Sequence, residues 1–178
     1  KMVSWFNQTL PKLIKVDLIG ECRDFISIEF TQHEDGSKEA THSKYWLALG
    51  EKYKEQLEGR NMRVPMKPGM DKKLADLKPT PEEHAAVADF GYRELVGSIS
   101  FPSCHTKLEI RFAVSLISRH LHDWDAICIN AALDCLSYCV NTHDIGSMWL
   151  PGIDPHGPNV PYGYADSGFS APRSQGGR

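Results

Sequence analysis

The chain has 178 residues, of which 41% are hydrophobic and 24% are charged, and its formal net charge is −3. This length suffices for one ordinary domain or two small ones, and the composition excludes wholesale disorder. The slight negative charge argues against a free-standing nucleic-acid-binding protein, although it permits a local basic surface.

The first forty residues predict a helix followed by a β-hairpin. Residues 1–14 place apolar side chains at helical spacing, but Pro11 argues against one uninterrupted helix. In residues 24–31 two sets of side chains alternate, which is the pattern of a strand; one set is Ile26, Ile28 and Phe30, and the other is Phe25, Ser27 and Glu29. Asp35-Gly36 then supplies a turn, so we expect a hairpin.

The next segment predicts one helix and then a connector. Apolar side chains recur every four residues from Tyr45 to Leu57 and indicate an amphipathic helix over about 43–58, which Gly59 would end. Residues 60–82 are rich in proline and glycine and predict an extended connector. Residues 52–78 hold eight basic and four acidic side chains, a net +4, which suits either phosphate contact or a solvated surface. The basic residues are Lys52, Lys54, Arg60, Arg63, Lys67, Lys72, Lys73 and Lys78.

Three helices are expected next, over about 81–101, 108–121 and 125–140. Each has apolar side chains on one side only, so the helices should pack on one another. The inward residues are Tyr92, Leu95, Val96 and Ile99 in the first helix, Ile110, Ala113, Val114, Ile117 and Leu121 in the second, and Ile129, Ala132, Leu133, Leu136 and Val140 in the third. Residues 151–161 hold four prolines and two glycines, typical of a linker, and residues 167–178 offer little that could pack.

These elements predict an α+β fold, in which a β-hairpin accompanies a bundle of three to four helices and an extended C-terminal tail. We expect four parts: residues 1–40 with the first helix and the hairpin, 41–80 with a helix and the basic connector, 81–150 with the helical bundle, and 151–178 as a linker with one further strand.

Several of these segments resemble copia-type retrotransposon polyproteins. Residues 92–99, Tyr-Arg-Glu-Leu-Val-Gly-Ser-Ile, and 113–119, Ala-Val-Ser-Leu-Ile-Ser-Arg, are similar to two of the family's helices, and 106–110 is similar to the Thr-Arg-Pro-Asp-Ile between them. Upstream, 25–30 resembles the family's Phe-Leu-Gly-Ile-Glu-Ile, and downstream 162–167 resembles the first strand of ribonuclease H. The matches follow the family's order. The resemblance therefore implies the C-terminal part of a reverse transcriptase, with primer grip, thumb and connection, running into the start of ribonuclease H.

The resemblance also implies residues for binding nucleic acid. The thumb helix would present Arg93, Gly97 and Phe101 to a template–primer duplex and follow its shape and backbone. The hairpin would be the primer grip, with Phe25, Ile26 and Ser27 at its centre, and Ser27 stands where the family has glycine. The plainer alternative is that Gly97 permits helix packing, Phe101 is core, Arg93 is solvated and the hairpin is an ordinary one.

Catalysis is expected to be incomplete. By the resemblance, the polymerase aspartates lie before Lys1 and the remaining ribonuclease H carboxylates after Arg178, which leaves Asp166 as the first carboxylate of an unfinished site. Two-metal phosphoryl chemistry needs several carboxylates. We therefore expect no metal or cofactor in the fragment, and Mg²⁺ only in a complete enzyme.

Two functions remain open. The first is a fragment or domesticated remnant of an RNA-directed DNA polymerase that contacts an RNA–DNA or DNA duplex. The second is a non-enzymatic protein-interaction or structural subunit of a larger complex. The expected partners are template–primer nucleic acid, the rest of the polyprotein or a protein complex, and no membrane, because every apolar run is shorter than the roughly 18–20 residues of a span.

The cysteines and histidines add three weaker indications. Five cysteines without a disulfide-like framework, and no visible secretory leader, favour an intracellular setting, cytoplasmic or nuclear. Cys135, Cys139 and His143 have the spacing of one helical face and suit zinc, but helical cysteines are usually small core residues. His120 and His122 lie near Asp123 and Asp125, where solvation of a helix end is favoured over a general base.

Overall fold

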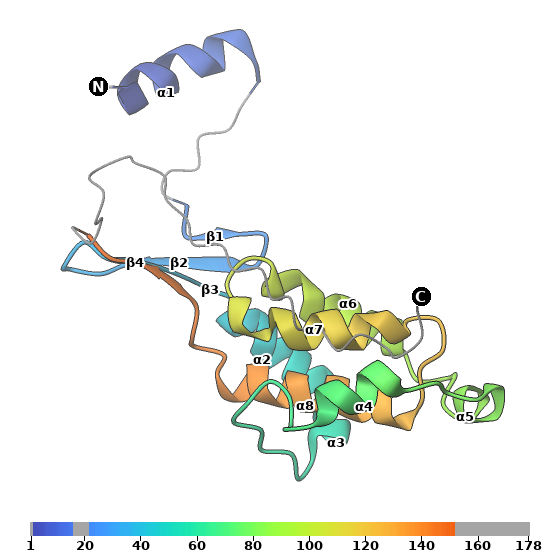
Figure 1. Cartoon of the computed structure of the whole chain (residues 1–178). Helices are drawn as coiled ribbons and strands as arrows, with labels where there is room; N and C mark the ends of the chain where they lie inside the picture. The colour runs from blue at the N-terminus through green and yellow to red at the C-terminus, as the bar shows by residue number, and fades with distance from the viewer. Residues whose placement is uncertain (1, 16–21, 152–178) are drawn as a thin grey trace, which may run out of the picture.

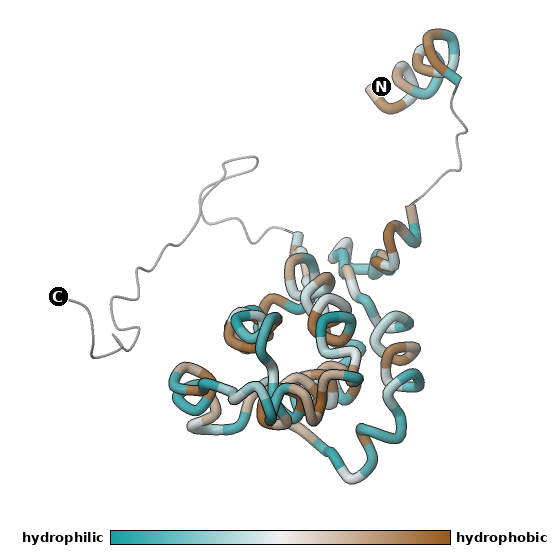
Figure 2. The backbone as a smooth tube through the Cα atoms, turned by 90° about the vertical axis from the view of Figure 1, so that its right-hand side faces the viewer, coloured by the Kyte–Doolittle hydropathy of each residue, from teal (hydrophilic) through white to brown (hydrophobic). Residues whose placement is uncertain are grey.

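The computed structural model describes residues 2–15 and 22–151. Within these ranges the chain has an α+β fold, with eight α-helices, two short 3-10 helices and one four-stranded antiparallel sheet (Figure 1). The body contains α2 to α8 with the sheet at its edge, and α1 stands apart in both views (Figures 1 and 2). The expected linker beyond Pro151, the ribonuclease H strand with Asp166 and the tail lie outside the described residues.

Helix α1 (Met2–Leu13) continues through Pro11, so the predicted interruption is wrong. The proline lies in the last turn of the helix, which ends two residues later at Leu13. No side chain of α1 is buried, and its apolar side chains, including Trp5 at 63% exposure, face solvent.

The predicted hairpin with its turn at Asp35-Gly36 is confirmed, but it belongs to a larger sheet. Strands β1 (Asp24–Phe25), β2 (Ile28–Gln32), β3 (Lys38–Thr41) and β4 (Ser147–Trp149) lie in that order, and all pairs are antiparallel. Gly36 has a φ of +84° at the predicted turn between β2 and β3. The single strand expected over 24–31 is wrong, because a turn at residues 26–27 divides it into β1 and β2.

The helix expected over 43–58 is present as α2 (Ser43–Lys52) and α3 (Lys54–Leu57), and Gly59 follows with a φ of +73°. The connector after it is not wholly extended. It contains α4 (Met70–Asp76), whose Leu74 is 1% exposed and belongs to the core. One buried leucine between prolines gave no helical periodicity from which this helix could be predicted.

The helix expected over 81–101 is divided. Helix α5 (Pro81–Ala85) begins with a capping box between Thr80 and Glu83, and α6 (Tyr92–Ser103) begins after Gly91. Helix α7 (Arg111–Ile117) lies between the 3-10 helices η1 (Leu108–Ile110) and η2 (Ser118–His120), which together match the second predicted helix.

The third predicted helix is confirmed as α8 (Ala126–Asn141). The Asp125 carboxylate caps it by accepting hydrogen bonds from the amides of Ile127 and Cys128, both at 2.9 Å. Helix α8 packs against α2, α4, α6 and α7, so it forms the centre of the helical body.

Most residues of the apolar stripes predicted for these three helices are buried in the core, whereas Leu121, Ile129 and Val140 are only partly buried and pack against it. Tyr92, Leu95, Val96 and Ile99 of α6 are each at most 2% exposed, and the Tyr92 hydroxyl donates to the Ile117 carbonyl at 2.7 Å. Burying one large apolar side chain is worth about 1.5–3 kcal/mol, so the stripes account for the packing of α6 to α8. No helix in the described part of the chain is both long and apolar enough to span a membrane.

Candidate nucleic-acid interface

The face of α6 opposite its buried stripe is open. Arg93 and Gly97 both lie on this face and are exposed. A Cβ atom built on Gly97 would meet no described atom within 4 Å. The plainer interpretation of Gly97, that it lets another helix approach, is therefore wrong for the described chain. A glycine inside an exposed helix costs about 1 kcal/mol relative to alanine, and nothing in the described fold offsets this cost.

Arg93 is held in one orientation although it is exposed. Its Nε donates to the Leu121 carbonyl at 2.8 Å, and its guanidinium lies 5.6 Å from the centre of the Trp124 ring. The four N–H bonds of its two terminal nitrogens have no hydrogen-bond partner among the described residues. A guanidinium that is fixed at Nε and free at its fork is suited to bind a phosphate or carboxylate.

Phe101 lies one turn further along α6 from Gly97 and is half-buried. Its ring packs at 5.2 to 6.0 Å, between ring centres, against the rings of His42, Tyr45 and His105. Phe101 therefore lies at the accessible edge of an aromatic cluster. It is neither fully buried in the core nor without ring contacts.

The three hairpin residues also lie together, but at a turn. Phe25 is 58% exposed and Ile26 60% exposed, and Ser27 is exposed as well. Ile26 has a φ of +51° and Ser27 a φ of +61°, a left-handed conformation that favours glycine and is rare for a β-branched residue. Ser27 therefore occupies a position at which such a turn favours glycine.

The hairpin and α6 meet at the start of α2. The Lys44 ammonium lies 2.9 Å from Glu29 of β2, and this hydrogen bond is the largest cause that raises the pKa of Lys44. The Tyr45 hydroxyl donates to the Ser98 carbonyl of α6 at 3.0 Å, and His42 contacts the ring of Phe101. The structure thus brings the hairpin and the Phe101 end of α6 onto one support.

The basic run over 52–78 is less available than its charge indicates. Lys52 pairs with Glu94 and Lys54 with Glu51, while Arg60 and Lys67 both bind Asp134. The other four, Arg63, Lys72, Lys73 and Lys78, have no ion pair with a residue that the structure describes. Phosphate contact stays a prediction for these four only.

Asp134 and Ser137 have a role that the sequence did not reveal. The Asp134 carboxylate is nearly buried and lies 2.7 Å from both the Arg60 guanidinium and the Lys67 ammonium. The Ser137 hydroxyl accepts a hydrogen bond from the Met62 amide at 3.3 Å. Together they attach the connector to α8. This attachment could not be predicted from the sequence, because the contacting residues lie about 70 positions apart in the chain.

Lys107 is the second residue that the sequence did not single out. It is fully buried, and its ammonium donates to the Thr142 carbonyl at 2.5 Å and to the Thr142 hydroxyl at 2.9 Å. Its charge also lies 3.3 Å from Glu109. Because Thr142 follows α8, Lys107 satisfies the C-terminal end of this helix.

Cys135, Cys139 and His143 are not grouped as metal ligands within the described residues. Cys128, Cys135 and Cys139 are each 0% exposed and belong to the hydrophobic core, and burial raises the pKa of Cys128 to about 12 and raises the pKa of Cys139. His143 instead lies 2.8 Å from the Ser43 hydroxyl. Residues 2–15 and 22–151 contain no group of three side chains placed to hold a metal ion.

His120 and Asp125 are structural residues. The His120 Nε2 donates to the Leu74 carbonyl at 2.8 Å and so fixes α4, while Asp125 caps α8. The expected solvation of this helix end is wrong for these two residues, because His120 is 7% exposed and Asp125 is 6% exposed.

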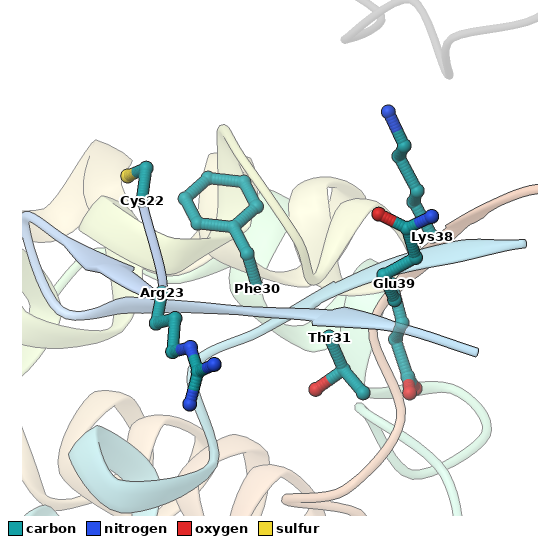
Figure 3. Close-up of a pocket in the computed structure, with 7 residues that line it drawn as sticks. Cys22, Arg23, Phe30, Thr31, Lys38 and Glu39 are labelled. Carbon is teal, nitrogen blue, oxygen red and sulfur yellow. The ribbon is translucent and has the colours of Figure 1, made fainter. Parts of the chain in front are cut away.

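A hollow of about 730 Å³ lies against the sheet (Figure 3). Phe30, Cys22 and Lys38 point to one side of the strands, and Arg23 and Glu39 point to the other (Figure 3). Its lining, completed by Thr31 and Gln32, mixes an aromatic ring, a thiol and charges of both signs, which defines no single ligand chemistry. No protein-family model, curated protein or solved structure matches the chain.

Proposed function

We propose that this chain binds a nucleic-acid duplex through the open face of α6 and the β1–β2 turn, as a thumb- and primer-grip-like segment of a reverse transcriptase. The observation that carries the proposal is Gly97, an exposed glycine in the middle of a helix with no described atom near its missing Cβ. An uncompensated glycine at such a position is useful where a surface outside the fold approaches the helix backbone closely.

The neighbours of Gly97 supply the remaining contacts. Arg93 and Phe101 lie four residues to either side of it, so the three positions span about 12 Å of helix, the length of three to four base pairs. The oriented fork of Arg93 would bind a backbone phosphate, and the edge of Phe101 would pack on a sugar. Such contacts follow the shape of a duplex and do not depend on its base sequence.

The charge of the chain sets the strength of this binding. With a net charge of −3 and half of the basic run already paired, few phosphates can be neutralised. We expect a Kd of about 10⁻⁴ to 10⁻⁶ M near physiological salt, the range of non-specific binding, with a steep dependence on salt.

Fluorescence anisotropy with a labelled RNA–DNA hybrid tests the proposal. Arg93→Ala should weaken binding and lower the slope of log K against log salt by about 0.9, the effect of one lost phosphate contact. Arg63→Ala is the matched control, because it removes the same charge from the exposed part of the connector. Loss of binding in Arg63→Ala with no change in Arg93→Ala would move the interface to the connector, and no hybrid binding at low salt would exclude the proposed function.

A second function, that of a protein-interaction or structural subunit, is favoured by a different observation. Phe25, Phe30 and Trp149 lie on one face of the sheet, and they are 58%, 38% and 56% exposed. An apolar face of this kind is usually covered by another protein surface. The rest of a polyprotein or a separate subunit would then be the partner. A stoichiometric complex that survives nuclease treatment and is lost in Trp149→Ser would favour this function.

A further inference from the structure

Helix α1 carries an apolar face that nothing in the described chain covers. Its apolar side chains occupy one side of the helix, and Met2, Val3, Trp5, Phe6 and Leu13 are 49–83% exposed. The opposite side holds Ser4, Asn7 and Gln8, and Lys12 lies at the border of the apolar face, two turns after Trp5. Residues 2–15 contain two lysines and no acidic residue, so α1 is a basic amphipathic helix without a partner.

The helical body contains a groove of the complementary kind. It lies between α2, α3 and α8 and has a volume of about 540 Å³. Leu47, Leu57 and Val140 give it an apolar floor, and Leu47 is 46% exposed. Three glutamates, Glu51, Glu55 and Glu58, line the same groove.

The charge balance of this groove is acidic. Lys54 pairs with Glu51, and Arg60 is already bound by Asp134, so neither cation neutralises the remaining two glutamates. Glu55 and Glu58 have no ion pair within the part of the chain that the structure describes. The groove therefore offers an apolar floor and free carboxylates to a basic amphipathic helix.

We propose that α1 of one copy occupies this groove of a second copy, so that the chain forms a dimer by mutual exchange of α1. This goes beyond the proposed duplex binding, and neither depends on the other. Helix α1 has 12 residues and is about 18 Å long, close to the roughly 20 Å of α2 and α3 along the groove. Lys12 and Lys15 of the entering helix would then face Glu55 and Glu58. Exchange in both directions gives a closed two-fold assembly that covers both apolar faces.

Sedimentation velocity of the full chain over a range of concentrations tests the exchange. Phe6→Gln on the apolar face of α1 should weaken dimerisation about tenfold or more, whereas Asn7→Gln on the polar face should leave it unchanged. Rising salt should weaken dimerisation, because the lysine–glutamate contacts lie at the surface.

Charge reversal identifies the groove. The α1 variant with Lys12→Glu and Lys15→Glu, and the groove variant with Glu55→Lys and Glu58→Lys, should each dimerise about tenfold more weakly. An equal mixture of the two should recover the native affinity, because both contacts in the mixed dimer again pair opposite charges. A dimer that ignores the groove variant would overturn the proposal. A monomer at all concentrations would overturn it too. In that case the apolar face of α1 would pack within its own chain, or would bind a membrane, which insertion of Trp5 into anionic vesicles would reveal.

Discussion

Two glycine-to-alanine substitutions should have opposite effects on stability, because the two glycines have opposite surroundings. In Gly97→Ala the new Cβ meets open space on an exposed helix, so only helix propensity changes. The free energy of unfolding should rise by about 0.5–1 kcal/mol. In Gly146→Ala the new Cβ would overlap the Ala40 carbonyl oxygen and lie 2.8 Å from Thr41 Cγ2. Since β3 and β4 pair there, this overlap should cost about 1–3 kcal/mol.

The stabilised variant should nevertheless bind the hybrid less well. If a duplex lies against α6 at Gly97, the added methyl group stands between the two surfaces. An overpacking cost of about 1–1.4 kcal/mol would weaken binding roughly five- to tenfold. The two measurements are urea unfolding for stability and hybrid anisotropy for affinity, on the same preparations.

This pair of measurements separates the fold from the function. A Gly97→Ala variant less stable than the native chain would show that α6 is covered at this point, which would refute the geometry on which the interface rests. A variant that is more stable and binds with unchanged affinity would leave the geometry intact and refute the duplex contact.

Three further predictions concern the attachment of the connector, the hairpin turn and the core. Asp134→Asn should lower the free energy of unfolding by about 2–4 kcal/mol in urea titrations, which is less than the loss of a fully buried ion pair because Lys67 is 56% exposed. The surface change Glu51→Gln should have almost no effect on the free energy of unfolding. Equal effects of the two substitutions would contradict the attachment of the connector by Asp134. Ser27→Gly should stabilise by about 0.5–1 kcal/mol, because its φ of +61° suits glycine; a destabilised variant would place a needed side-chain contact at the turn. Burial lowers the pKa of His42 below 6.5, so the unfolded chain binds the proton before the folded chain does. The free energy of unfolding should therefore fall as the pH drops below about 6.5, by at most about 1.4 kcal/mol per pH unit. Unfolding curves measured from pH 7.5 to 5.5 should show a shallower fall in His42→Gln than in the native chain.

The parts of the fold that could be predicted are the helices whose apolar residues repeat at regular, short intervals in the sequence. The apolar side chains of α6, α7 and α8 repeat every three to four residues. All four residues predicted to face inward in α6 are buried. The break between α5 and α6 was missed because residues 86–91 contain no proline, and the chain turns there around the partly buried Val87 and Phe90. Strand β4 was missed because its partner β3 lies more than 100 residues earlier in sequence.

The candidate site shows the same division. The spacing of Arg93, Gly97 and Phe101 on one face of α6 follows from the helical repeat, and could be stated from the sequence. Whether that face is covered depends on where the other helices lie, so neither the open space at Gly97 nor the aromatic cluster around Phe101 could be inferred. The positive charge of the connector overstated its capacity to bind phosphate for the same reason. Asp134 lies 74 residues from Arg60 in sequence, yet it pairs with two cations of the connector, Arg60 and Lys67.

The distribution of paired charges also limits how the proposed interface can work. Two cations of the connector are paired with Asp134, and Arg93 is the one arginine on the open face of α6, so a single phosphate contact places the Kd at the weak end of the expected range, near 10⁻⁴ M. A contact with a Kd near 10⁻⁴ M is nonetheless well occupied when a tether supplies an effective concentration of about a millimolar. Duplex binding through α6 is therefore expected to matter where another part of the assembly already holds the nucleic acid. Fusing the chain by a short linker to a sequence-independent single-strand-binding domain should make the Arg93→Ala defect measurable near physiological salt, and a fusion in which the variant binds as well as the native chain would refute the tethered contact.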